Sequence, residues 1–123
     1  MGFELKRPWI IPWSRKAHEL PLEARQRDCF REIHNALFRA YLVEGLDIGR
    51  IDILMDLSCQ NGMDPVKSKA TLDVDEPRAA VLSERKAAVQ AGVSRPPTML
   101  RLGRRVEGYP DEKTLREFVS PQE

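Results

Sequence analysis

The residues best suited to thiol chemistry are two cysteines, Cys29 and Cys59, which lie far apart in the sequence. Thiol–disulfide exchange needs a reactive thiolate, typically in a Cys-x-x-Cys pair at a helix N-terminus. The sequence contains no Cys-x-x-Cys, and we expect neither cysteine at a helix N-terminus. We therefore predict no catalytic residue and two buried or half-buried reduced thiols. A redox pair between the two cysteines is the alternative.

Metal binding and histidine chemistry are not expected either. Cys29 and His34 lie five positions apart with no second pair of ligands for zinc. His18 and His34 fall in predicted helices without a nucleophile partner, so we interpret them as structural. The sequence therefore indicates no metal and no cofactor.

Two tryptophans and a Pro-Thr pair are the candidate binding residues. Trp9 and Trp13 crowd a proline-rich apolar stretch that another surface must cover. They either line an apolar pocket or pack in a core or interface. Pro97 and Thr98 lead into a short apolar segment, where Pro97 either borders a thiol or substrate pocket or only shapes the loop.

A basic cluster follows on the predicted hairpin, formed by Arg101, Arg104 and Arg105. Two interpretations stay open for it. It is a solvated turn, or it is a site for an anion.

Composition is that of an ordinary single domain. The 123 residues carry 20 basic and 19 acidic side chains, a formal net charge of +1, which lacks the basic field needed to bind nucleic acid. No apolar run approaches the roughly 20 residues of a membrane span. The N-terminus has no signal-peptide apolar region. We expect a cytoplasmic protein with no nucleic-acid or membrane partner.

The N-terminal half should be helical after one short strand. Residues 3–6 alternate apolar and polar, which predicts a strand. Ser14 is a good N-cap for a helix, with a kink or a late start near Pro21. Asp28 should cap the next helix, which ends at Gly45. Its apolar residues recur at helical spacing: Phe30, Ile33, Leu37, Phe38, Tyr41 and Leu42.

The C-terminal half should contain three more helices and a hairpin after the helical segment 51–59. Asp64 and Pro65 begin a short helix, and Pro77 begins a longer one that reaches Ala91. The apolar residues of that longer helix are mostly alanines, so we expect it to pack closely against a neighbour. A hairpin and a final helix over 111–119 follow. The prediction is a mostly α protein of the α/β class with two or three short strands.

Three stretches together resemble a known family: residues 14–20 (SRKAHEL), 34–49 (HNALFRAYLVEGLDIG) and 91–98 (AGVSRPPT). In this order and spacing they are similar to the DsbA-like thioredoxin superfamily. The nearest branch resembles the FrnE-type disulfide oxidoreductases, with 2-hydroxychromene-2-carboxylate isomerases and kappa-class glutathione transferases close by.

The resemblance implies a partial thioredoxin-like fold within a single domain over 1–123. Residues 1–13 would hold a strand and the proline-rich apolar segment, and 14–92 a helical insertion. Residues 93–123 would hold a cis-proline loop at Pro97, the hairpin and the final helix. The family's first strand and helix, with the Cys-x-x-Cys or the thiol-activating serine, have no counterpart here.

Two functional hypotheses follow from the resemblance. The first is a truncated DsbA-like protein without thiol–disulfide catalysis, which acts as a binding or structural module and forms a homodimer. The second is a thiol–disulfide oxidoreductase or glutathione-dependent isomerase of the same family, active only with a missing N-terminal segment. A pocket for a small thiol or an apolar ligand is a further expectation.

Overall fold

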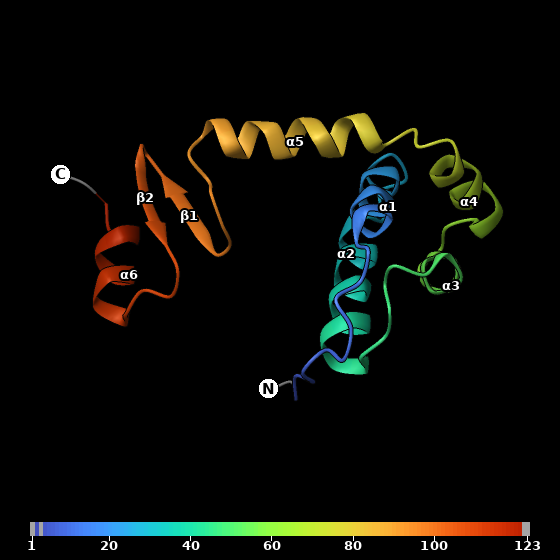
Figure 1. Cartoon of the computed structure of the whole chain (residues 1–123), viewed down its shortest axis with the longest axis horizontal. Helices are drawn as coiled ribbons and strands as arrows, with labels where there is room; N and C mark the ends of the chain where they lie inside the picture. The colour runs from blue at the N-terminus through green and yellow to red at the C-terminus, as the bar shows by residue number, and fades with distance from the viewer. Residues whose placement is uncertain (1, 3, 122–123) are drawn as a thin grey trace. The chain divides into compact units, whose positions relative to one another are not determined.

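The computed structural model describes residue 2 and residues 4–121. The protein is mostly helical and contains one two-stranded antiparallel sheet, as the sequence predicts (Figure 1). Its contacts divide the chain into two compact units, residues 1–83 (unit 1) and residues 84–123 (unit 2). Each unit is described by itself, and the single domain over 1–123 stays a prediction.

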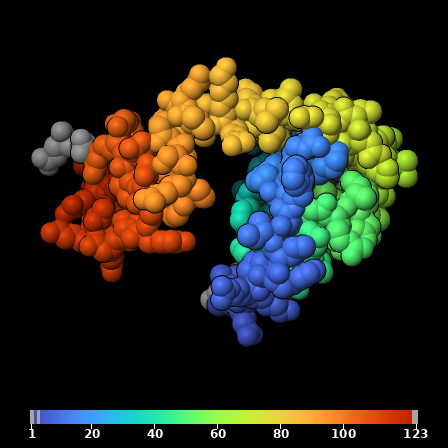
Figure 2. Space-filling view, viewed as in Figure 1, coloured from blue at the N-terminus to red at the C-terminus, as the bar shows by residue number. Residues whose placement is uncertain are grey.

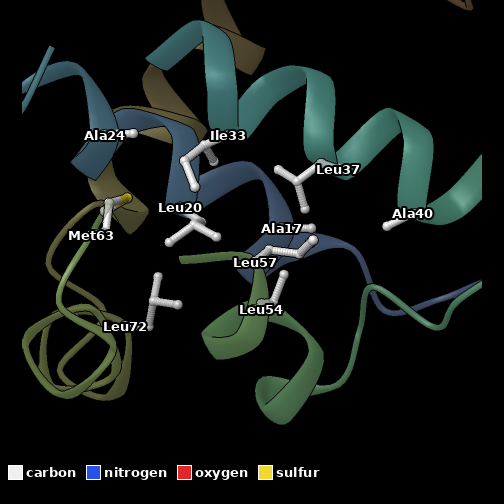
Figure 3. Packing of buried hydrophobic residues seen from close by; sticks show 10 residues of the cluster. All are labelled: Ala17, Leu20, Ala24, Ile33, Leu37, Ala40, Leu54, Leu57, Met63 and Leu72. Atoms are coloured by element: carbon white, nitrogen blue, oxygen red, sulfur yellow. The ribbon is translucent and has the colours of Figure 1, made fainter. Parts of the chain in front are cut away.

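Unit 1 is a small helical bundle whose helices close around one core (Figure 3). Leu20, Ile33, Leu54 and Leu72 meet there, and each has 0% of its surface exposed. Burying a leucine or isoleucine side chain contributes about 1.5–3 kcal/mol, so these four residues are the main stabilisation of the bundle. The elements are α1 (Arg15–Arg25), α2 (Phe30–Arg39), the π-helical turn η1 (Ala40–Glu44), α3 (Ile51–Gln60) and α4 (Pro65–Asp73).

The first helix begins where the sequence predicts, and Pro21 lies inside it. α1 starts at Arg15 and continues through a buried Pro21 to Arg25, so the expected late start is wrong. Ser14 occupies the N-cap position, yet its side chain makes no capping hydrogen bond. A proline inside a helix removes one backbone hydrogen bond, and Leu20 beside it is fully buried in the core.

The connection between α1 and α2 differs from the prediction. Asp28 does not cap α2, because it adopts a left-handed conformation with φ of 55°. Cys29 is the N-cap residue instead, and its backbone N–H donates to the carbonyl oxygen of Ala24 at 3.2 Å. Aspartate tolerates the left-handed region better than most residues, which lets the chain reverse here. The predicted end at Gly45 is confirmed, with φ of 73°.

The predicted N-terminal strand is absent from the described residues 4–6. Phe3 lies outside the described residues. The Lys6 N–H donates to the carbonyl oxygen of Leu42 at 2.7 Å, so this stretch attaches to the end of a helix rather than to a sheet. An alternating pattern forms a strand only where a neighbouring strand supplies a hydrogen-bonded ladder.

Unit 2 contains a hairpin and a helix. β1 (Thr98–Arg101) pairs antiparallel with β2 (Arg104–Glu107), with Thr98 opposite Glu107. Asp111 caps α6 (Glu112–Val119) by accepting the Thr114 N–H at 2.8 Å, as predicted. Phe118 of α6 is 4% exposed. The Pro96–Pro97 peptide bond is cis, as the family resemblance implies.

The long helix α5 (Arg78–Gln90) does not pack as predicted. None of its residues is buried, and Leu82 and Val89 are exposed. The prediction was wrong because alanine methyl groups bury too little apolar area to dictate a contact. Alanine has the highest intrinsic helix propensity, so it supports a helix without requiring a neighbour.

Candidate functional site

The segment before α1 is held against unit 1 through its backbone and one indole nitrogen. Besides the bond from Lys6, the Nε1 atom of Trp9 donates to the Gly45 carbonyl oxygen at 3.0 Å. Gly49 lets the chain pass closely, since a Cβ there would lie 3.0 Å from the backbone nitrogen of Trp13. These contacts fix the path of the segment along η1 and the loop that follows it.

The same segment directs its large apolar side chains outward. Trp9 is 74% exposed, Ile11 93% and Trp13 81%, and this N-terminal stretch lies on the surface of unit 1 (Figure 2). The sequence predicts that another surface covers these residues, and nothing within the described residues of unit 1 does. Exposed large apolar residues that gather on one part of a protein commonly mark a binding surface. We call the following set the aromatic surface: Leu5, Trp9, Ile11, Trp13 and Phe38.

An apolar groove of about 380 Å³ opens beside the aromatic surface. Ile11 and Pro12 form one side, and Leu37 and Phe38 of α2 form the other. A volume in the range of roughly 300–1,000 Å³ is typical of small-molecule sites. The polar side chains of this first groove are Ser14, His18, His34 and Tyr41.

The apolar face of α2 explains why the groove exists. The sequence predicts a wide apolar stripe, and the structure buries only part of it: Ile33 and Leu37 enter the core, whereas Phe38 is 56% exposed. The His34 ring lies between two phenylalanine rings, with centroid distances of 5.4 Å to Phe30 and 4.9 Å to Phe38. His34 and Phe38 also border a second groove of about 680 Å³, which extends along α2 to Leu42.

The candidate residues Pro97 and Thr98 lie in unit 2, apart from this surface in the sequence. Pro97 is exposed, and Thr98 is half-buried. The Thr98 hydroxyl donates to the Arg95 carbonyl oxygen, and the Pro97 carbonyl accepts the Gly108 N–H at 2.9 Å. Both residues therefore have local structural contacts, and their predicted binding role stays a prediction.

The basic cluster on the hairpin is used within unit 2. Arg101 Nη1 donates to the carbonyl oxygens of Phe118 at 3.0 Å and Ser120 at 2.7 Å. Arg104 Nη1 donates to the Glu117 carbonyl oxygen at 3.1 Å, and Arg105 pairs with Glu107 at 3.3 Å. The contacts of Arg101 and Arg104 satisfy carbonyls at the end of α6, which favours a structural role over an anion site.

The cysteines are placed differently from the prediction. Both are free thiols, but Cys59 is exposed rather than buried. Cys29 does lie at a helix N-terminus, contrary to expectation, as the N-cap residue of α2. Its half-buried Sγ donates to the Ala24 carbonyl oxygen at 3.7 Å. Within the described residues, no three His, Cys, Asp or Glu side chains cluster as a metal site would require.

Two glutamates are buried in unit 1, a feature that the sequence analysis missed. Glu19 is 0% exposed and lies 3.3 Å from Arg15, and Glu23 is 4% exposed. Glu23 accepts a hydrogen bond from the Ser68 hydroxyl at 3.2 Å and pairs with Arg27 at 3.4 Å. Burial raises the pKa of Glu23 above its ordinary value, although both partners oppose the shift.

A scan of known protein-family models and a search of curated proteins each found no match to this chain. Across residue 2 and residues 4–121, each helix is too short or too polar to cross a bilayer. The interpretation of the site therefore depends on its own geometry.

Sequence reasoning found the two tryptophans but missed Phe38 as a member of the aromatic surface and His18 and His34 as lining residues of the first groove. One signal was available, because the apolar stripe of α2 is wider than one neighbouring helix covers. Phe38 stays exposed because of how α1 and the segment before it pack, and this packing is a property of the tertiary structure.

Proposed function

We propose that this chain is a DsbA-like module that binds partners through the aromatic surface and does not catalyse thiol–disulfide exchange. The observation that carries the proposal is the aromatic segment itself. It is anchored by one backbone hydrogen bond from Lys6 to Leu42 and one from the Trp9 indole to Gly45, while Trp9, Ile11 and Trp13 are each more than 70% exposed. A segment fixed in this way presents apolar area without losing further conformational entropy on binding.

The DsbA-like lineage is part of the proposal and is supported by sequence. The stretches 34–49 and 91–98 resemble that family, and the hairpin followed by α6 has the element order expected of its C-terminal part. The absence of catalysis is supported by the cysteines. Neither Cys29 nor Cys59 belongs to a Cys-x-x-Cys pair, and the Cys29 thiol is engaged with Ala24.

A second copy of the chain is the partner we propose for the aromatic surface. A two-fold dimer is the commonest closed assembly, and it brings the same patch of both copies together. Tryptophan and phenylalanine are enriched in the buried centres of such interfaces. The grooves beside the surface would also accept a small apolar ligand.

Sedimentation velocity over a range of protein concentrations tests the dimer. We expect concentration-dependent dimerisation of the wild type and a monomer for the double variant Trp9→Ser/Trp13→Ser. Val66→Ser is the matched control, because Val66 is 76% exposed on the same unit but lies outside the aromatic surface. A wild-type chain that stays monomeric throughout would refute the homodimer.

The alternative is a thiol oxidoreductase or a glutathione-dependent isomerase of the same family. The position of Cys29 at the N-terminus of α2 favours it, since helix N-termini stabilise thiolates. An insulin-reduction assay tests whether the chain by itself has this activity. We expect no turnover from the purified chain, whereas turnover that disappears in Cys29→Ser but persists in Cys59→Ser would establish the enzyme.

A further inference from the structure

The polar groups of the first groove are candidates for binding a charged ligand. The groove is mainly apolar, and the chain's two histidines, His18 on α1 and His34 on α2, both line it. Both side chains are exposed. Within the described part of the chain, neither imidazole has a hydrogen-bond partner, so both are available to a ligand in the groove.

Carboxylates are absent from the described lining of both grooves. The titratable side chains there come from α1 (His18), from α2 (His34 and Arg39) and from η1 (Tyr41), and the segment before α1 contributes none. Arg39 borders only the second groove and is already paired with Glu44 at 3.1 Å. Glu19, next to His18 in sequence, has no exposed surface and pairs with Arg15. An anion in the first groove therefore meets no negative charge on its walls.

The position of His34 adds a geometric argument. Its ring is held between Phe30 and Phe38, four residues before and after it on the same helix, so the imidazole does not have to be ordered when a ligand binds. A protonated imidazole carries a positive charge and donates hydrogen bonds from both ring nitrogens. The groove thus joins an apolar wall with two groups that can carry positive charge.

We propose that the first groove binds an amphipathic anion, a single alkyl or aryl chain that ends in one carboxylate or sulfonate group. The chain lies against Ile11, Leu37 and Phe38, and the head group lies between His18 and His34. The ligand is a free monomer rather than a lipid in a membrane. This inference rests on the proposed function, because it assigns a ligand class to the same apolar surface.

The test compares two probes of equal chain length, 1-octanesulfonate and 1-octanol, by NMR titration of the ¹⁵N-labelled full chain. The sulfonate is ionised at pH 6 and the alcohol is uncharged, so the comparison isolates the contribution of the head-group charge. At pH 6 we expect the sulfonate to bind roughly tenfold more tightly than the alcohol, the effect of two partly exposed ion pairs.

The decisive variant is His18→Gln/His34→Gln. We expect it to keep the wild-type affinity for octanol and to lose the preference for octanesulfonate at pH 6. Arg39→Gln is the matched control, because it removes a cation outside the first groove. This variant should keep the wild-type preference for octanesulfonate over octanol. Retained amide spectra establish that each variant is folded.

The other outcomes separate the two proposals. Equal binding of both probes at pH 6 would refute the anion preference while leaving an apolar binding groove. Failure of both probes to shift groove resonances would refute the groove as a ligand site altogether. Co-sedimentation with phosphatidylglycerol vesicles that survives His18→Gln/His34→Gln would assign the anion to a lipid surface and overturn the inference.

Discussion

The indole nitrogen of Trp9 donates a hydrogen bond of 3.0 Å to the backbone carbonyl oxygen of Gly45, the left-handed residue that ends η1. Carbonyls at the end of a helix lack intrahelical partners, so this one is available to a side chain. The bond holds the edge of the ring while 74% of the residue stays exposed. The contact therefore connects the end of a helix to the aromatic surface.

Trp9→Phe should loosen the N-terminal segment. The substitution keeps an aromatic ring but removes the donor, at a cost of about 0.5–1.5 kcal/mol for a neutral hydrogen bond. Urea unfolding followed by circular dichroism measures the cost, and hydrogen exchange at Lys6 reports the segment locally. Trp13→Phe is the control, since its backbone rather than its ring approaches Gly49. Its effect should stay within about 0.5 kcal/mol, and equal losses in both variants would contradict this role for Trp9.

Two residues in capping positions should differ in their contribution to stability. Asp64 accepts the N–H groups of Val66 at 2.9 Å and Lys67 at 3.3 Å, whereas the Ser14 side chain caps nothing. Asp64→Ala should therefore lower the free energy of unfolding by about 1 kcal/mol. Ser14→Ala should change it by less than about 0.5 kcal/mol. Thermal and urea unfolding measure both changes. A larger loss of stability in Ser14→Ala than in Asp64→Ala would contradict the assignment.

Glu23 should make the stability of the folded chain depend on pH. Burial raises its pKa in the folded state, more than the Ser68 hydroxyl and Arg27 lower it. Between the ordinary glutamate pKa and this raised value, the folded chain holds the proton longer than the unfolded chain does. The free energy of unfolding should consequently fall as the pH rises through that interval and then level off.

Glu23→Gln tests this assignment because it removes the titration and leaves a side chain of similar size. Urea unfolding at a series of pH values should show that the variant lacks the fall seen in the wild type. Glu32→Gln, at an exposed position on α2, should retain the wild-type profile. Identical profiles for wild type and Glu23→Gln would exclude Glu23 as the cause.

Arg101 should stabilise the end of α6 in unit 2. Its guanidinium donates to two carbonyl oxygens there, those of Phe118 and Ser120. Arg101→Ala should speed hydrogen exchange of the α6 amides about fivefold, which corresponds to about 1 kcal/mol for the lost hydrogen bonds. Arg95→Ala removes only a 3.8 Å contact with Glu107 and should leave the exchange rates unchanged. Equal exchange in the two variants would show that Arg101 does not hold the helix.

The sequence by itself determined where several of the helices begin and end. Asp64 and Asp111 cap helices as predicted, and Gly45 ends the second helical segment with a positive φ. These features depend on a few neighbouring residues, because a cap or a left-handed terminator acts within a single helical turn. The hairpin was predictable for the same reason, since its two strands are adjacent in the chain.

Tertiary structure decided what each element packs against. Residues 4–6 alternate as a strand would, but Lys6 bonds to Leu42 of η1, and no alanine of α5 is fully buried. Phe38 has the periodicity of a core residue, yet it borders two grooves beside the histidines. Hydrophobic attraction has no direction, so a local pattern specifies which face of a helix is apolar but not which partner covers it.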